Sequence, residues 1–433
     1  MKKIALTNAL IVDPSQNIKK LGTLIINDKK IANIIFNNSF IPTKKDHKII
    51  NCKKLPLCPG FVDIKCHLRV PGEEHKENLR YASDSAAAAG ITSLVCMPNT
   101  DPIIDNVPIV ELLQRKARKE SDVKIHTTAS ITKGLRGNDI TEIGLLIEAG
   151  AVGFTDAIRA VDDTTVMLRA LKYASAFDAI IMQHPEDNSL SKGGSMNSSL
   201  LSTELGIKGI PEEAEVLQVD RDIRLAEMTN SKIHFFNITT GLALKSIELA
   251  QKKGIKVTCS TSPHYFNLTE NDIRYWRTYA KVSPPLRDLQ NVESIKMGIK
   301  NNIINYISSD HSPHDTDSKR LPFEQASAGI VGFESLLPLT IKLINEKKLS
   351  LSKAVELLSV NAAKLLKLNV GSLKKGKPAD LVVFDPNKKI TLSSNVIKSK
   401  SKNYPFENLK AKGKVMLTMV DGKIIYNDRK FSL

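Results

Sequence analysis

The sequence has few of the features that mark secreted or membrane proteins. Its five cysteines (52, 58, 66, 96 and 259) are odd in number, and no two of them form a C-x-x-C pair. This excludes a disulfide framework and indicates a reducing compartment. No apolar run approaches the roughly 18 uninterrupted residues of a membrane-spanning helix. The opening residues, 1–8, soon turn polar and lack the long apolar stretch of a secretory signal. We therefore expect a soluble, cytoplasmic protein.

Aromatic residues are also scarce, at 5% with a single tryptophan, whereas positive charge is abundant. The 433 residues include 62 Lys and Arg against 46 Asp and Glu, which gives a formal charge of +16. Such a charge is typical of nucleic-acid-binding proteins. However, the lysines are dispersed, the densest basic run (residues 398–402) is short and contains no Arg, and no helix-turn-helix, zinc-finger or RNA-binding motif is present. We interpret the charge as a lysine-rich surface, and we expect neither nucleic acid nor membrane as a partner.

The two ends of the chain share a pattern of short apolar runs separated by tight turns. At 42% hydrophobic residues, the chain can bury a large core. The predicted strands cover residues 4–6, 9–12, 23–26 and 31–35 at one end and 379–384, 415–420 and 423–426 at the other. Asp421-Gly422 between two such runs is a strong signal for a β-hairpin. Because neither end has enough strands for a stable sheet alone, we predict one small β domain built from residues 1–55 and 366–433.

Between these ends, strand-like runs alternate with helical ones. The predicted strands are 60–63, 93–97, 124–126, 151–154, 179–182, 232–236, 255–258 and 303–307, and the predicted helices include 79–89, 108–119, 162–176 and 242–253. About eight βα repeats indicate an α/β fold, a distorted (β/α)₈ barrel of the TIM type over residues 56–365. In such barrels the chemistry lies at the C-terminal ends of the strands.

Polar residues follow these predicted strands. In the first of them Asp63, Lys65, His67 and Arg69 alternate, so that an extended segment turns all four to one side. Imidazole and carboxylate groups suit a divalent metal such as zinc. A single His or Asp is more often structural, but several at consecutive strand ends favour a shared site. The other members of this set are Asn99, Asp156, His184, Asp310 and His314.

Several motifs together resemble the dihydroorotases of the amidohydrolase superfamily. The resemblance is to the longer bacterial class that can associate with aspartate carbamoyltransferase, and it runs nearly from end to end. The matching segments are 59–63 (PGFVD), 67–69 (HLR), 96–100 (CMPNT), 150–156 (GAVGFTD), 283–287 (SPPLR), 310–314 (DHSPH) and 376–381 (GKPADL).

This resemblance implies an activity and a set of ligands. The activity is the reversible hydrolysis of the cyclic amide of dihydroorotate to carbamoyl aspartate in pyrimidine biosynthesis, by an enzyme that holds one or two zinc ions. It also implies a homo-oligomer and aspartate carbamoyltransferase as a partner. The implied metal ligands are His67, Asp156, His184 and Asp310.

The resemblance also assigns roles in proton transfer and substrate binding. Asp310 would shuttle the proton of the attacking water as well as bind the first metal. The substrate carboxylate would be held by Arg69, Asn99 and His314, since a planar anion suits the arginine fork.

Two positions depart from the family pattern. The first His of the opening Asp-x-His-x-His-x-Arg motif is Lys65, and the last His ligand is Asn237. His234 cannot simply replace Asn237, because an offset of three residues places it on the opposite face of the strand. In addition, Ala157 follows Asp156 where a second acid is usual, and Ser283 stands in place of an Asn.

The positive charge of Lys65 disfavours a metal ion at the same position. An ammonium about 4 Å from a divalent ion costs about 8 kcal/mol at an effective dielectric constant of about 20. Lys65 is therefore uncharged, or points away, or the first metal is absent. In the simplest of these arrangements the ammonium takes the place of the metal and pairs with Asp156 and Asp310.

Three hypotheses about function follow. The chain is a dihydroorotase, or it is a non-catalytic homologue that serves as a structural partner of aspartate carbamoyltransferase. A related cyclic-amide hydrolase is the remaining alternative.

Overall fold

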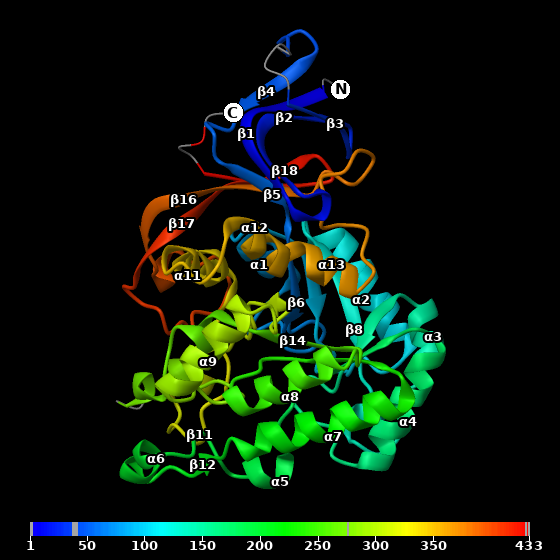
Figure 1. Cartoon of the computed structure of the whole chain (residues 1–433), viewed down its shortest axis with the longest axis vertical. Helices are drawn as coiled ribbons and strands as arrows, with labels where there is room; N and C mark the ends of the chain where they lie inside the picture. Colours follow the sequence, from blue (N-terminus) through cyan, green and yellow to red (C-terminus); the bar gives the residue numbers. More distant parts are fainter. Residues whose placement is uncertain (1–2, 37–41, 275–276, 429–430, 432–433) are drawn as a thin grey trace.

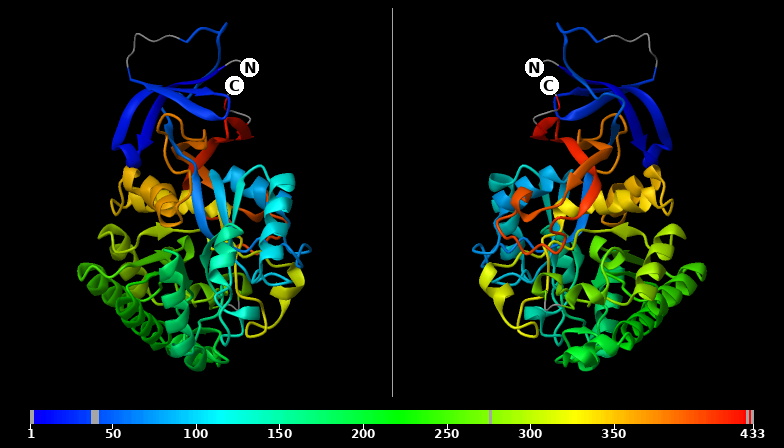
Figure 2. Two further views of the ribbon diagram at one scale, coloured as in Figure 1. Left: turned by 90° about the vertical axis from the view of Figure 1, so that its right-hand side faces the viewer. Right: turned by 90° about the vertical axis from the view of Figure 1, so that its left-hand side faces the viewer.

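The computed structural model describes residues 3–36, 42–274, 277–428 and 431, and two large sheets organise this part of the chain (Figure 1). One sheet is parallel and forms the barrel. The other gathers strands from both ends of the sequence and lies at one end of the barrel (Figure 2). No helix in the described part of the chain combines the length and the apolar character needed to cross a membrane.

The barrel contains eight parallel strands arranged in chain order. They are β6 (Phe61–Cys66), β7 (Ile91–Cys96), β8 (Lys124–Ala129), β9 (Ala151–Phe154), β10 (Ile180–Gln183), β13 (Lys232–Phe235), β14 (Val257–Thr261) and β15 (Tyr306–Ile307). The last and first strands meet just beyond β15, where the amide of His67 donates to the carbonyl of His311 at 2.8 Å. The predicted (β/α)₈ barrel is therefore confirmed.

One barrel strand is shorter than we predicted. Residues 303–307 were expected to be a strand, but β15 begins only at Tyr306. The amides of Ile303 and Ile304 instead donate to the carbonyl of Gly298, at 3.0 and 3.2 Å, in the turn that ends the preceding helix. An apolar run cannot by itself distinguish a buried turn from a strand.

Helices surround the barrel and follow most of its strands (Figures 1 and 2). Several begin at a side-chain cap: Asn78, for example, accepts a hydrogen bond from the amide of Tyr81 at 3.0 Å, which satisfies an otherwise free amide of the first turn. The helices are α1 (Leu79–Ala88), α2 (Val107–Glu120), α3 (Ile143–Glu148), α4 (Thr164–Ala176), α5 (Asn188–Ser191), α6 (Leu200–Leu205), α7 (Glu213–Thr229), α8 (Gly241–Lys252), α9 (Leu289–Lys300), α10 (Thr316–Arg320), α11 (Phe333–Asn345), α12 (Leu351–Val355) and α13 (Asn361–Leu365).

The second large sheet joins the two ends of the chain, as the sequence predicted. Its strand order is β18-β17-β16-β5-β1-β2-β3, with β4 also paired to β1. The strands are β1 (Lys3–Asp13), β2 (Ile18–Asn27), β3 (Lys30–Ile35), β4 (His47–Asn51), β5 (Pro56–Pro59), β16 (Leu381–Thr391), β17 (Lys410–Val420) and β18 (Lys423–Asn427). Residues 196–197 and 209–210 add a small separate pair, β11 and β12.

A single residue separates the two sheets. β5 pairs with β1 and β16 in the terminal sheet, Gly60 follows it, and β6 opens the barrel. A Cβ atom on Gly60 would lie 2.2 Å from the side chain of Thr92, so only glycine fits this close approach. The terminal sheet thus runs on past residue 55, where we expected the β domain to end, and the division into domains stays a prediction.

Candidate active site

Lys65, Asn237 and Asp310 meet at the C-terminal end of the barrel. Lys65 lies near the end of β6, and the other two follow β13 and β15. The Nζ atom of Lys65 is 3.0 Å from Oδ1 of Asp310, and Nδ2 of Asn237 donates to Oδ2 of Asp310 at 2.8 Å. All three side chains are buried. Both carboxylate oxygens of Asp310 are therefore bound by the two residues that stand where the family pattern has histidines.

Burial controls the ionisation of this centre. It raises the pKa of the Asp310 carboxyl, and the neighbouring charge of Lys65 acts in the opposite direction. Burial also lowers the pKa of His67 and of His184 well below the usual value, with a further lowering from nearby cationic side chains, Lys65 among them. These imidazoles are therefore neutral at neutral pH.

Three residues of the site have an unusual backbone conformation. Arg69, Asn237 and Asp310 lie in the left-handed region, with φ of 60°, 50° and 53°. Such a conformation costs on the order of 1–3 kcal/mol for a residue other than glycine, and it clusters at functional sites. The fold therefore maintains strain at the positions where these side chains turn toward the barrel mouth.

Asp156 does not pair with Lys65, and the expectation that the ammonium contacts both acids was wrong for this residue. Its carboxylate accepts hydrogen bonds from the amides of Ile131 and Thr132, at 2.8 and 3.0 Å, and from the hydroxyl of Thr132. Burial raises the pKa of Asp156 to about 6 in spite of these bonds. The loop after β8 thus donates hydrogen bonds to both carboxylate oxygens of Asp156, which are the atoms that a bridging metal ligand needs.

Arg69 and His314 lie side by side, while Asn99 contacts a different residue. Nη2 of Arg69 is 3.0 Å from Nε2 of His314, and Nη1 donates to Glu73 at 2.9 Å. The amide oxygen of Asn99 accepts from Nδ1 of His67 at 2.8 Å, which leaves Nε2 of that imidazole as the atom with a free lone pair. That these residues bind one carboxylate stays a prediction.

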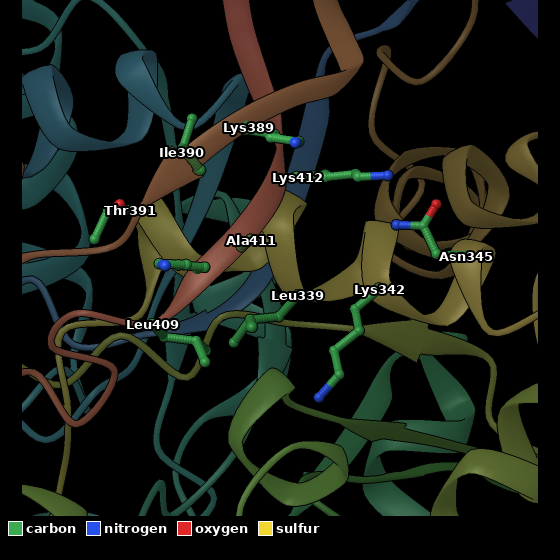
Figure 3. Close-up of a pocket in the computed structure, with 10 residues that line it drawn as sticks. Leu339, Lys342, Asn345, Lys389, Ile390, Thr391, Leu409, Ala411 and Lys412 are labelled. Atoms are coloured by element: carbon green, nitrogen blue, oxygen red, sulfur yellow. The ribbon is translucent and has the colours of Figure 1, made fainter.

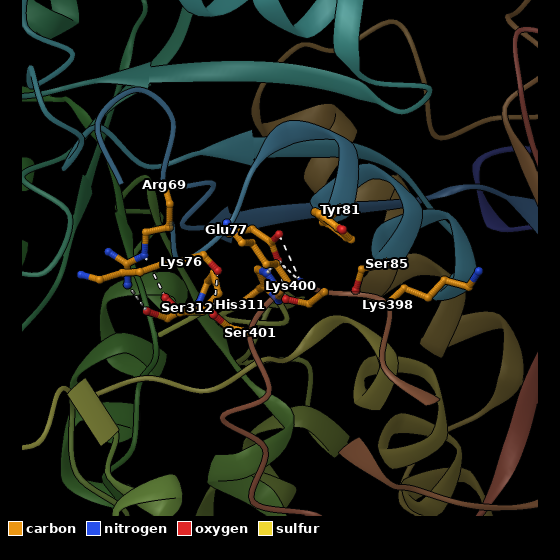
Figure 4. Close-up of polar contacts among 12 residues, drawn as sticks. Arg69, Lys76, Glu77, Tyr81, Ser85, His311, Ser312, Lys398, Lys400 and Ser401 are labelled. Carbon is orange, nitrogen blue, oxygen red and sulfur yellow. Dashed lines mark hydrogen bonds and ion pairs between the residues drawn. The ribbon is translucent and has the colours of Figure 1, made fainter. Parts of the chain in front are cut away.

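A segment of the terminal sheet's long β16–β17 connection supports this group. Residues 398–403, which we call the strap, run along the loop that follows Arg69 (Figure 4). The hydroxyl of Ser401 donates to the carbonyl of Lys76 at 2.6 Å, and the hydroxyl of Ser399 donates to the buried Glu77. Asn403, which is 2% exposed, accepts from the amide of His314 and donates to the carbonyl of Ser312, both at 3.0 Å. The strap therefore contacts two segments near Arg69: the loop that follows it and residues 312–314.

Sequence reasoning missed His264, which follows β14. This imidazole is fully buried, and its Nε2 atom lies 3.6 Å from Oδ2 of Asp310. Neither ring nitrogen has a hydrogen-bond partner among the residues that the structure describes, and burial lowers the pKa of this imidazole to about 3. Its position after a barrel strand is the signal that could have identified it. His184 resembles it in part: Nε2 lies 3.3 Å from the hydroxyl of Ser283, while Nδ1 has no hydrogen-bond partner in the described part of the chain.

The residues as arranged do not fit a metal centre. No group of three or more His, Cys, Asp or Glu side chains in the described ranges is placed to hold an ion. His234 is also engaged, with Nδ1 at 3.0 Å from the hydroxyl of Thr258 and Nε2 at 3.1 Å from that of Ser260. The ammonium of Lys65 lies on Asp310 instead. We therefore derive no catalytic step through a metal.

Comparison with known proteins identifies the family. Residues 54–242 match a family model described as dihydro-orotase-like, and residues 315–426 match one described as an amidohydrolase family, whose members are generally metal-dependent. Two solved structures share the fold. They are an L-hydantoinase (dihydropyrimidinase) from Arthrobacter aurescens (TM-score 0.88, 23% identity, 100% of this chain and 98% of that chain) and a dihydropyrimidinase from Brevibacillus agri (TM-score 0.86, 21% identity, 99% and 96%).

Curated relatives match over almost the whole length. A dihydroorotase from Syntrophotalea carbinolica is 41% identical over 98% of this chain and 99% of its own length. Dihydroorotases from Acetivibrio thermocellus (41% identity, 97% of this chain and 98% of the relative) and Ehrlichia canis (40%, 98% and 95%) match similarly. At this identity and coverage, the chain belongs to the dihydroorotase family.

Proposed function

We propose that this protein acts at the dihydroorotate step of pyrimidine biosynthesis, with dihydroorotate and carbamoyl aspartate as the ligands of its barrel. The reaction of this step is the reversible hydrolysis of the cyclic amide of dihydroorotate. The observation that carries the proposal is the match of about 40% identity to dihydroorotases over nearly the full chain. The strand-end residues His67, Asp156, His184 and Asp310 of the family pattern are all present.

Arg69 and His314 are the residues that we assign to the substrate carboxylate. Arg69 keeps its charge and offers a planar fork of donors, which suits a carboxylate. Neutral His314 lies against it at 3.0 Å, and burial lowers the pKa of this imidazole to about 2. Asn99 is assigned to the same ligand from the neighbouring strand end. The substrate carboxylate would replace Glu73 as the acceptor of the hydrogen bond from Nη1 of Arg69.

Asp310 is the group that we assign to proton transfer. Hydrolysis of an amide requires a base that takes a proton from water and an acid that returns one to the departing nitrogen. Burial raises the pKa of Asp310 toward the range in which a carboxyl can do both. In the structure the carboxylate is bound to Lys65 and Asn237, so turnover requires that at least one of these contacts opens.

A second candidate function is that of a non-catalytic dihydroorotase homologue. The observation that favours it is the buried ion pair between Lys65 and Asp310, which occupies the carboxylate that hydrolysis needs. In this case the protein serves as a structural partner of aspartate carbamoyltransferase. Zinc as the cofactor, assembly into a homo-oligomer and a cytoplasmic location stay predictions under either candidate.

One set of assays separates the two candidates. Protein purified without chelator is assayed for ring opening of dihydroorotate and for ring closure of carbamoyl aspartate, with Asp310→Asn as the matched variant. Turnover that Asp310→Asn abolishes supports the enzyme. Absence of turnover, together with co-purification of aspartate carbamoyltransferase, supports the structural partner. Absence of turnover, of ligand binding and of such a complex would remove both.

A further inference from the structure

A groove outside the barrel combines apolar surface with a set of exposed lysines. It lies between α11 and the outer ends of β16 and β17 and has a volume of about 540 Å³ (Figure 3). Leu409 and the half-buried Ile390 contribute apolar surface, and four lysines surround it: Lys342, Lys389, Lys410 and Lys412. None of the described residues that line the groove is acidic.

The four lysines are exposed and have no acidic partner. Among the described residues, none has a carboxylate oxygen within 4.0 Å, although many other lysines of this chain form such pairs. Lys389 and Lys412 are moreover directly opposite each other in the antiparallel pairing of β16 and β17. Like charges at opposed positions destabilise a sheet. The groove thus carries an uncompensated charge at a cost in stability.

The charges are spread around the groove and do not converge on one point. In Figure 3 the ammonium groups of Lys389 and Lys412 extend toward Asn345, whereas that of Lys342 extends in another direction. A single phosphate cannot contact groups arranged in this way, but an extended chain with several carboxylates can. Leu409 and Ile390 add apolar surface for the side chains between those carboxylates.

The strand ends beside the groove are also free to accept a chain. β5 pairs only with residues 381–383 of β16, and β18 pairs only with residues 417–420 of β17. Residues 389–391 and 410–412 therefore have no strand partner other than each other in the described part of the chain. Exposed strand edges bind extended peptides through main-chain hydrogen bonds.

We propose that this groove binds an extended acidic segment of a partner protein, in which carboxylate side chains alternate with apolar ones. The lysines supply the charge complementarity, and Leu409, Ile390 and the strand edges supply the remaining contacts. The site lies outside the barrel, so its occupation does not depend on whether the barrel hydrolyses dihydroorotate.

The test uses fluorescence anisotropy with the whole protein. The probe is a labelled peptide of alternating glutamate and leucine, and the control peptide has glutamine in place of glutamate. We expect saturable binding of the acidic peptide, at least about tenfold weaker binding of the glutamine peptide, and weakening with added salt. The double variant Lys389→Glu Lys412→Glu should lose binding at least about tenfold. Lys119→Glu Lys300→Glu, which makes the same charge change at exposed helix positions, should retain it.

A stability measurement guards against a misfolded variant. Lys412→Glu alone places opposite charges across the strand pair, so it should raise the melting temperature while it weakens peptide binding. Equal loss of binding in the Lys119→Glu Lys300→Glu control would show non-specific attraction and overturn the proposal. Failure of the unmodified protein to bind the acidic peptide would also overturn the proposal. So would sedimentation data in which the protein self-associates and the Lys389→Glu Lys412→Glu variant does not, because the groove would then be an interface between copies of this chain.

Discussion

Replacing Lys65 should change how the barrel binds zinc. The ammonium lies 3.0 Å from Oδ1 of Asp310, and a zinc ion on the same carboxylate would be about 2.1 Å from an oxygen, so cation and metal would be within about 4 Å of each other. At an effective dielectric constant of about 20 this repulsion is about 8 kcal/mol. A penalty of that size weakens zinc binding by roughly five to six orders of magnitude.

The double variant Lys65→His Asn237→His removes this penalty and supplies two imidazoles. We expect its zinc content, measured by mass spectrometry after dialysis against a zinc buffer, to rise from well below one to about one ion per chain or more. Lys65→Met removes the charge without adding a ligand and should give an intermediate content. Lys65→Arg keeps the charge and should match the unmodified protein. Circular dichroism verifies that each variant is folded.

Two results would refute this reasoning. If the unmodified protein and the double variant held equal amounts of zinc, Lys65 would not compete with the metal. If the folded double variant gained no zinc, the remaining residues would be unable to complete a site. In that case the hydrogen bonds that Asp156 accepts from Ile131 and Thr132 would be the first contacts to examine.

Three further predictions concern ligand binding and stability. Arg69→Lys should weaken binding of carbamoyl aspartate at least about tenfold by calorimetry, since the planar fork is lost; unchanged affinity would exclude Arg69 as the carboxylate ligand. Asn403→Ala removes the contacts that hold His314 and Ser312, so it should weaken the binding of carbamoyl aspartate. Asn403→Asp should restore less than half of the lost affinity. A fall in melting temperature with full affinity would assign the strap a purely structural role. Burial raises the pKa of Asp222 in the folded protein to about 6. The protonated carboxyl therefore contributes to the free energy of unfolding below about pH 4, and this contribution is lost as the pH rises through about 6. Relative to Asp222→Asn, the unmodified protein should therefore lose about 3 kcal/mol of unfolding free energy between about pH 4 and pH 7 in urea titrations, and parallel pH profiles would contradict the assignment.

The barrel and the terminal sheet could be predicted because their signals are local. Runs such as Ala151–Phe154 and Lys232–Phe235 are short, apolar and bounded by turns, and Asp421-Gly422 fixes the register of one hairpin, in which Val420 pairs with Lys423. The alternation of strands and helices then leaves few topologies open. The strand-end rule likewise located Lys65 and Asp310 on the same face of the barrel.

The contacts within the site could not be predicted in the same way. Lys65 pairs with Asp310 and not with Asp156, because backbone amides after β8 already occupy the second carboxylate. Every residue other than proline carries the same backbone N–H donor, so the sequence gives no sign of which amides bind Asp156. The strap acts on residues that precede it by more than 80 positions, as the bond from Asn403 to Ser312 shows. From the sequence alone, its serines and lysines therefore indicate only a basic run on the surface.

The ammonium of Lys65 lies where the family pattern would place a metal. Diffraction at the zinc absorption edge, from crystals of the unmodified protein grown with zinc, would locate any zinc bound at this position. We expect no anomalous peak within coordination distance of Asp310, and electron density that places Nζ of Lys65 about 3.0 Å from Oδ1 of Asp310. A strong anomalous peak on Asp310, with Lys65 turned away from it, would instead show that zinc displaces the ammonium.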